Sequence, residues 1–158
     1  MQSEGYDSAE VCLNGHCTNS SAVDFPLHSK KHCDRCGAET IKQCQHCRNR
    51  IRGYLRGSMA VRPYEPPAFC HTCGKAYPWT ESRLEAARDL ANQLGFDIPE
   101  RTLLEKSIEE LVRDTPRAPA EAVRFKTMVE KAQPWALGAF KEILYGVVGE
   151  SVKRMIWP

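Results

Sequence analysis

The sequence predicts an α+β protein in two parts, a small metal-binding module followed by a helical domain. All eight cysteines of the 158-residue chain lie between positions 12 and 73. The second half has none, and its apolar residues recur at the spacing of amphipathic helices. Glycine and proline interrupt the short strand patterns of the first half, so turns dominate there. We therefore expect a double zinc ribbon at 11–78 and a bundle of about four helices at 79–158.

The first ten residues are polar, and we expect them to form a flexible tail. They lack the positive and apolar regions of a signal peptide. No stretch approaches the 18 uncharged apolar residues of a membrane span. These absences predict a cytoplasmic protein without a membrane partner. In that reducing compartment, Cys-x-x-Cys pairs favour metal binding over disulfides.

Short strands and longer helices are expected in turn along the chain. The strand candidates are 40–42, 51–56 and 61–64. Thr80 is expected to cap the first helix, and Pro99 and Pro119 are expected to open the second and third. The expected helices end near residues 94, 115 and 133, and the fourth covers 135–157. Short connections between them are typical of a helical bundle.

The metal-donor side chains fall into four pairs. Three pairs are Cys-x-x-Cys knuckles, and the first combines Cys12 with either His16 or Cys17. Structural zinc takes four tetrahedral ligands, so four pairs predict two closed Zn²⁺ sites, with iron–sulfur ligation as the main competitor. The knuckle donors are Cys33, Cys36, Cys44, Cys47, Cys70 and Cys73.

Two pairings of these donors are possible. Sequential pairing joins the first pair to the second and the third to the fourth, whereas cross-brace pairing joins alternate pairs. Residues 37–43 separate the second and third pairs, which is long for a cross-brace and long enough for a strand. The spacing therefore favours sequential pairing. His32, His46 and His71 each adjoin a knuckle cysteine and are expected to be exposed rather than ligands.

The closed sites argue against catalysis. A catalytic zinc keeps one position open for water, but each site here can be filled by four protein donors. No nucleophile elbow, His-Glu-x-x-His motif or phosphate-binding loop is present. We expect a non-enzymatic protein with no small-molecule substrate.

A basic stretch gives the protein two candidate partners. Five arginines with two interleaved tyrosines, Tyr54 and Tyr64, predict a nucleic-acid-binding hairpin as the alternative function. However, residues 1–78 hold ten Lys/Arg and seven Asp/Glu, and two zinc–thiolate centres would cancel that excess. A protein-interaction adaptor is therefore favoured, with Trp79, Trp135 and Trp157 as candidate anchors or core residues. The arginines are Arg48, Arg50, Arg52, Arg56 and Arg62.

Longer motifs around the donors resemble a bacterial family catalogued only as a domain of unknown function. The motifs are Cys12-Leu-Asn-Gly-His16, Cys33-x-x-Cys36-Gly-Ala-x-Thr-Ile, Cys44-x-x-Cys47, Ile51-Arg-Gly-Tyr54 and Tyr64-Glu-Pro-Pro-Ala-Phe-Cys70-His-x-Cys73-Gly-Lys-x-Tyr-Pro-Trp79-Thr80. The resemblance covers most of the chain. It implies that His16 is the fourth ligand of the first site and that Cys17 is an extra thiol. It carries no established activity.

Overall fold

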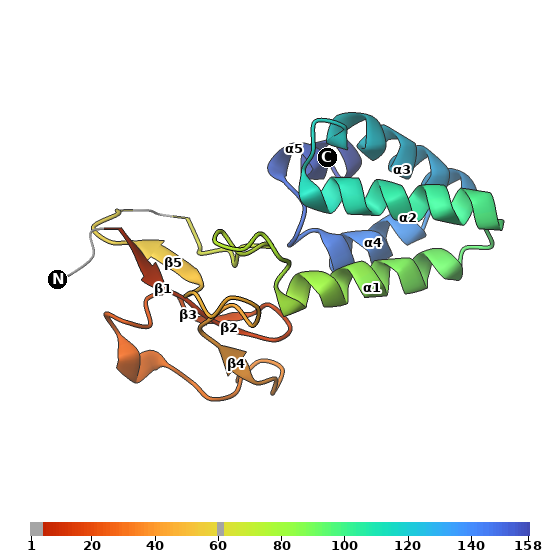
Figure 1. Ribbon diagram of the computed structural model, residues 1–158. Helices are drawn as coiled ribbons and strands as arrows, with labels where there is room; N and C mark the ends of the chain where they lie inside the picture. The colour runs from red at the N-terminus through yellow and green to blue at the C-terminus, as the bar shows by residue number, and fades with distance from the viewer. Residues whose placement is uncertain (1–4, 60–61) are drawn as a thin grey trace. The chain divides into compact units, whose positions relative to one another are not determined.

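The computed structural model describes residues 5–59 and 62–158, and it divides the chain into two compact units. The first unit runs to Glu81 and the second begins at Ser82, close to the expected boundary. Short strands and turns make up the first unit and helices the second (Figure 1). The predicted α+β class is confirmed.

Two small antiparallel sheets organise the first unit. Strand β1 (Tyr6–Ser8) pairs with β5 (Arg52–Leu55). Strand β2 (Glu10–Cys12) lies between β3 (Cys17–Asn19) and β4 (Thr40–Ile41) in the second sheet. One 3-10 turn, Pro26–His28, lies in the long loop between β3 and β4. The expected strand at 61–64 begins outside the described residues, and its described part is not a strand.

The expected flexible tail at residues 1–10 is wrong from residue 6 onward. Strands β1 and β2 occupy this segment, and every residue from Asp7 to Glu10 is buried. The polar composition was misleading because the acidic side chains are satisfied inside the fold. Residues 1–4 lie outside the described residues.

Asp7 shows how a polar strand can be buried. Its carboxylate accepts hydrogen bonds from the backbone N–H groups of Ser8, Val23 and Asp24. Burial raises the pKa of Asp7, but these N–H groups and the guanidinium of Arg56 outweigh it and hold that pKa below its ordinary value. The carboxylate thus fastens β1 to the loop that follows β3.

Glu10 fastens β2 to the same loop. Its carboxylate accepts a hydrogen bond of 2.6 Å from the hydroxyl of Thr18 and one of 2.7 Å from the backbone N–H of Lys30. Buried carboxylates are tolerated when hydrogen-bonded in this way. The loop is therefore held by two acids from the segment that sequence reasoning had left out of the fold.

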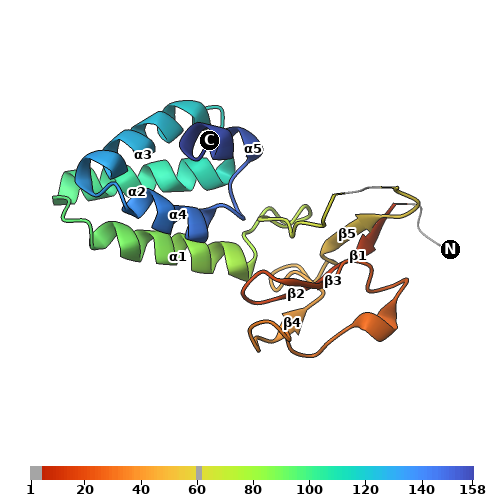
Figure 2. The ribbon, with the colours of Figure 1, turned by 180° about the vertical axis from the view of Figure 1, so that it is seen from behind.

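The second unit contains most of the helices, and their apolar faces form its core. α2 packs on α3, and α3 packs on α4 and α5 (Figure 2). Leu104, Ile108, Phe125, Phe140 and Leu144 have no exposed surface. The bounds are α1 Pro78–Asn92, α2 Ile98–Arg113, α3 Ala118–Ala132, α4 Ala136–Leu144 and α5 Glu150–Ile156.

Two details of the helix prediction are wrong. The expected helix at 135–157 is two helices, because the chain turns after Leu144 and the next helix begins at Glu150. The guanidinium of Arg83 donates a 2.9 Å hydrogen bond to the Ile143 carbonyl near the end of α4. Thr80 does not cap α1, because it lies inside the helix and donates its hydroxyl to the Ala68 carbonyl.

Candidate metal centres

The three Cys-x-x-Cys knuckles share one backbone conformation. In each, the first cysteine donates its N–H to the carbonyl five residues later at 2.8 Å, and it accepts an N–H from the residue after the second cysteine. That residue has a positive φ in all three knuckles. The residues are Gly37 (φ 77°), Arg48 (φ 66°) and Gly74 (φ 74°).

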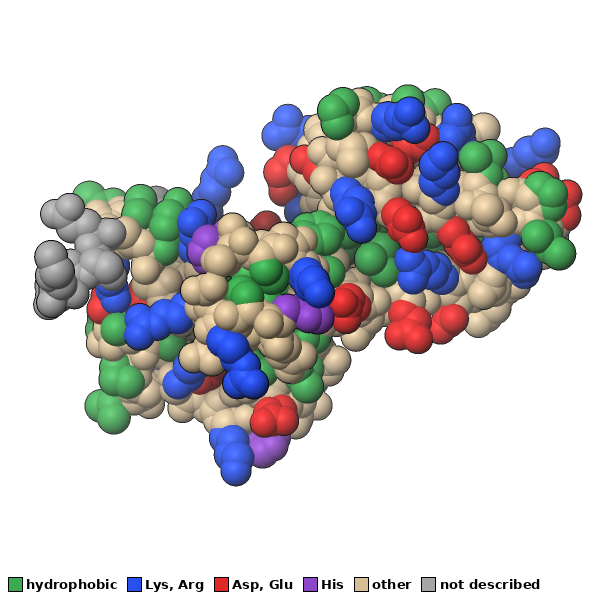
Figure 3. Space-filling model, in the orientation of Figure 1, with side chains coloured by type: hydrophobic (Ala, Val, Ile, Leu, Met, Phe, Trp, Pro, Cys, Tyr) green, Lys and Arg blue, Asp and Glu red, His purple; other side chains and the backbone are tan. Residues whose placement is uncertain are grey.

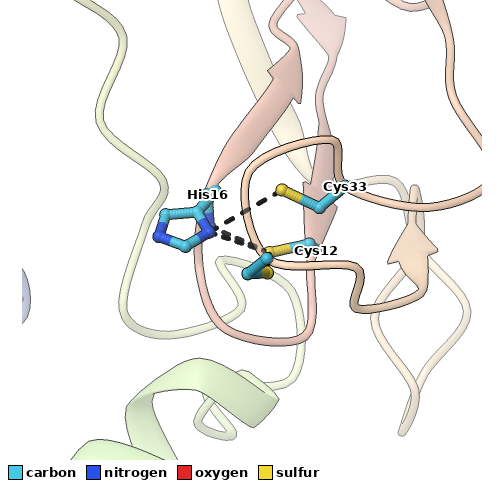
Figure 4. A group of neighbouring side chains, drawn as sticks. Cys12, His16 and Cys33 are labelled. Carbon is cyan, nitrogen blue, oxygen red and sulfur yellow. Dashed lines mark hydrogen bonds between the residues drawn. The ribbon is translucent and has the colours of Figure 1, made fainter.

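The first donor pair is built differently, on the β2–β3 hairpin. The backbone N–H of Cys12 donates to the carbonyl of His16 at 2.9 Å, and Gly15 donates back to Cys12 at 2.8 Å. Gly15 has φ of +90°, which few side chains tolerate. The tight turn thus directs the His16 ring back toward the Cys12 sulfur (Figure 4).

The first centre brings together Cys12, His16, Cys33 and Cys36. The Nδ1 atom of His16 lies 3.5 Å from the Cys12 sulfur and 3.7 Å from that of Cys33 (Figure 4). The sulfurs of Cys12 and Cys36 are 3.7 Å apart. Zinc–sulfur bonds of about 2.3 Å in a tetrahedron give edges of about 3.8 Å, so this donor set fits one tetrahedral ion.

The second centre brings together Cys44, Cys47, Cys70 and Cys73. The sulfurs of Cys44 and Cys73 are 3.7 Å apart, and those of Cys47 and Cys70 are 3.6 Å apart. A cluster of several irons would separate the thiolates further, because iron and sulfide atoms would lie between them. Each centre combines two donor pairs that are neighbours in the sequence, which is the sequential pairing that the spacing favoured. Strand β4 lies between the second and third pairs, in the segment that connects the two centres.

The structure also shows which cysteine and histidine residues beside the donors belong to neither group. Cys17 lies outside both groups and pairs with Val11 across the sheet. Burial raises the pKa of its thiol to about 11, so it stays protonated at neutral pH. His32, His46 and His71 are exposed and belong to neither group.

Nitrogen donors surround the sulfurs and stabilise negative charge on them. The N–H of Ala38 lowers the pKa of Cys36 to about 6. Burial raises the pKa of Cys70, but the N–H groups of Cys73 and Thr72 outweigh it and bring the value to about 6. Asn49 donates its side-chain N–H to Cys47 at 3.4 Å. A backbone N–H lowers the pKa of Cys73, but burial and the neighbouring sulfurs outweigh it and raise that pKa to about 11. Burial also raises the pKa of Cys12, so in the absence of a metal only some of the donors are held ready as thiolates.

Tyr77 places a buried hydroxyl beside a sulfur of the second centre. It is only 1% exposed, and among the described residues its hydroxyl is the one buried side-chain oxygen or nitrogen without an oxygen or nitrogen partner. Burial and the adjacent Cys70 sulfur both raise the pKa of Tyr77. A metal-bound Cys70 thiolate is a suitable acceptor for this O–H, so the donor set and its surroundings fit a cation.

The two centres contact one aromatic stack. Tyr77 and Trp79 stack with ring centroids 4.6 Å apart. They share the core of the first unit with Cys44 and Cys70, and the indole N–H of Trp79 donates to the Pro67 carbonyl. A Cβ atom on Gly15, in the hairpin turn of the first centre, would lie 3.0 Å from that of Trp79. The hairpin of the first centre therefore packs against a stack that reaches the second.

Over its described residues, the basic stretch at 48–62 contributes one strand, β5, and no hairpin of its own. Strand β5 pairs with β1, and the guanidinium of Arg56 is engaged with Asp24 at 3.2 Å and Asp7 at 3.9 Å. The hydroxyls of Tyr54 and Tyr64 donate to the carbonyls of Arg62 and Arg52, so these tyrosines are structural. Arg48, Arg50, Arg52 and Arg62 are exposed.

The three tryptophans have different surroundings. Trp79 is buried in the first unit, and Trp157 packs against Phe125 and donates to the Leu137 carbonyl. Trp135 is 63% exposed. Only Trp135 therefore remains a candidate surface anchor.

Two groups of four sulfur and imidazole donors, carried on short turns, define a protein with two candidate metal centres arranged as a double ribbon. The chain belongs to a bacterial family described as "Uncharacterized protein conserved in bacteria (DUF2321)", whose model matches residues 5–156. This confirms the family resemblance of the motifs. No curated protein and no solved structure gives a significant match. Across residues 5–59 and 62–158, no helix is long and apolar enough to cross a membrane.

Proposed function

We propose that this protein is a non-enzymatic, cytoplasmic adaptor that binds another protein and holds two structural Zn²⁺ ions. Sulfur-rich tetrahedral donor sets are typical of structural zinc. Each centre supplies four protein donors, which leaves no position for a substrate or a reactive water. A reducing compartment would keep the donor thiols available for the metal.

Zinc would supply stability that the first unit lacks. Its strands have two to four residues each, and its apolar core is small. A structural zinc ion contributes roughly 10–16 kcal/mol in small zinc-binding peptides. The chain's own part is to direct the donors inward and to supply N–H groups to the sulfurs.

An exposed apolar surface on the first unit carries the adaptor proposal. Phe25 and Leu55, 58% and 46% exposed, line one cleft of about 320 Å³. Leu27 and Met59, each 96% exposed, lie in the two segments that contribute this cleft. We call Phe25 and Leu55, the two that line the cleft, the apolar edge. Exposed apolar groups of this kind are commonly buried against a partner protein, and hydrophobic side chains are visible on this unit in Figure 3.

Affinity capture from a native bacterial host, in the presence of nuclease, tests the adaptor proposal. A Phe25→Ser, Leu55→Ser double variant should lose a protein that the wild-type chain retains. Val123→Ser is the matched control, because Val123 is an exposed apolar residue of α3 in the other unit. Retention by the double variant, or loss of capture after nuclease treatment, would contradict the proposal.

Metal analysis tests the zinc component separately. Protein purified without chelator should contain close to two zinc ions per chain, and the Phe25→Ser, Leu55→Ser variant should contain the same. One zinc ion or none would overturn the double zinc site without deciding the partner.

A further inference from the structure

A groove on the first unit gathers basic side chains around the second knuckle. One cleft of about 590 Å³ is lined by Arg48, Arg50, Arg52 and His71, among others. A second cleft, of about 600 Å³, is lined by Lys42 and again by Arg48. Gln43 and Arg48 line both clefts, so the two adjoin at these residues. We call the two adjoining clefts the basic groove.

Apart from the second metal centre, whose Cys44 lies in the lining, the groove has few acidic neighbours, although Lys42 is paired with the buried Glu10 at 3.6 Å. Asp7 is the single acidic residue in either lining, and it is buried and satisfied by backbone N–H groups and Arg56. The structure gives no ion pair between Arg48, Arg50 or Arg52 and any other described residue. Their guanidinium groups are therefore available to an anion.

The backbone at Arg48 carries a cost that the knuckle does not require. Arg48 has φ of 66°, whereas glycine fills the same position in the other two knuckles. The left-handed conformation costs a non-glycine residue about 1–2 kcal/mol. The knuckle's backbone hydrogen bonds are equivalent in all three cases and need no side chain at this position. A strained residue at the centre of a basic groove is a sign of a functional side chain.

We propose that the basic groove binds single-stranded nucleic acid, with Arg48, Arg50 and Arg52 on its phosphates. Arginine presents a fork of donors that matches phosphate oxygens. Tyr6, half exposed in the same cleft with the Arg52 guanidinium 4.3 Å above its ring, adds an aromatic surface beside the phosphate contacts. Such a combination of cations and an aromatic ring is typical of single-strand binding.

The residues that line the groove favour single-stranded nucleic acid over a membrane surface, a peptide or a duplex. Of its isoleucines, Ile51 is buried and Ile41 is half-buried, so beside Tyr6 the lining offers little apolar surface to a bilayer or to the anchor residues of a peptide. The clefts have the size of small-ligand sites, which suits individual nucleotides better than a duplex. The surface differs from the expected hairpin, because neither Arg56 nor Arg62 lines it.

Fluorescence anisotropy with labelled 12-nucleotide dT and U oligonucleotides tests the proposal on the full metal-loaded chain. Binding to at least one oligonucleotide is expected at 50 mM salt. Three phosphate contacts give a slope of about −2 in log K against log salt, so affinity should fall about twentyfold between 50 and 200 mM. No binding at 50 mM salt would overturn the proposal.

Arg48→Gly is the decisive variant, because it installs the residue that the other knuckles carry. It should weaken oligonucleotide binding severalfold while leaving the melting temperature unchanged or raised. Arg50→Gln and Arg52→Gln should weaken binding as well. Arg35→Gln is the matched control, because Arg35 is an exposed knuckle arginine outside both clefts.

Several outcomes would contradict the assignment. Undiminished binding by Arg48→Gly, or equal weakening by Arg35→Gln, would show that the groove is not the site. Preference for a 12-base-pair duplex, or binding to phosphatidylserine vesicles without binding to either oligonucleotide, would assign the surface to another partner. None of these results bears on the affinity-capture experiment. That experiment changes the side chains of the apolar edge and is carried out in the presence of nuclease.

Discussion

The two candidate metal centres use similar donors but are held by different structures. The first joins a hairpin pair, Cys12 and His16, to one knuckle, and its fourth donor is an imidazole. The second joins two knuckles and has four sulfurs, two of which, Cys44 and Cys70, belong to the apolar core. The difference indicates that the second centre supports the core of the first unit, whereas the first fastens the β2–β3 hairpin to the long loop.

Charge separates the centres as well. With a divalent ion, three thiolates and an imidazole leave a formal charge of −1, and four thiolates leave −2. The basic groove begins beside the second centre, at Cys44 and Arg48. A metal-bound second centre would therefore lower the cost of gathering several cations around one knuckle.

The largest effect should follow from removing a core donor. Cys70→Ser should lose the second ion and unfold the first unit, because structural zinc supplies roughly 10–16 kcal/mol and this sulfur lies in the apolar core. Cys33→Ser should lose only the first ion and keep the core. Metal content and the dispersion of amide resonances measure both effects. Equal unfolding of the two variants would remove the distinction between the centres.

The next effect should identify the fourth donor of the first centre. His16→Ala should reduce the metal content to about one ion per chain, because it removes a donor that lies 3.5 Å from the Cys12 sulfur. Cys17→Ala should keep both ions, since its thiol is outside the group. Spectra of the cobalt-substituted variants report the coordination directly. Loss of tetrahedral cobalt from Cys17→Ala would reverse the assignment.

A smaller effect should follow from crowding the aromatic stack. Gly15→Ala places a Cβ 3.0 Å from that of Trp79 at a positive φ, and should destabilise the first unit by about 1–3 kcal/mol. Gly57→Ala is the control, because Gly57 also has a positive φ but has nothing within 4 Å of an added Cβ. Urea unfolding compares the two. Equal losses would mean that the contact with Trp79 contributes nothing.

The smallest effect should come from the hydroxyl of Tyr77. Tyr77→Phe should weaken zinc binding at the second centre about tenfold by removing an O–H that can bond the Cys70 thiolate. The stability of the metal-free chain should change less, since no oxygen or nitrogen accepts this O–H. Competition with a chromophoric chelator measures each step. Tyr64→Phe is the control, because the hydroxyl of Tyr64 bonds the Arg52 carbonyl. It should leave the zinc affinities of both centres unchanged.

The arrangement of donors could be predicted because knuckles are local. Spacing alone places two sulfurs on one turn, and the seven residues at 37–43 leave room for β4, so the sequential grouping follows from sequence. The first pair could not be settled in this way, because Cys12 lies four residues from His16 and five from Cys17. The choice depends on the hairpin turn at Gly15 and on which side chain faces the centre.

Features that depend on distant residues were missed. The burial of Asp7 and Glu10 requires backbone N–H groups from the loop that follows β3. The sequence around the two acids does not predict these distant partners. The end of α4 involves Arg83, sixty residues earlier in the chain. The basic groove combines Tyr6 and His71 with the second knuckle, and inspection of one arginine-rich segment could not bring these residues together.

The stack of Tyr77 and Trp79 also allows metal binding to be followed by the intrinsic fluorescence of Trp79. Trp79 is the only tryptophan before Ser82, and the other two, Trp135 and Trp157, can be replaced by phenylalanine. Indole emission responds to its immediate neighbours, and a light-absorbing ion such as cobalt quenches it at short range. Emission from Trp79 should therefore record the order in which the two centres fill, without any attached label.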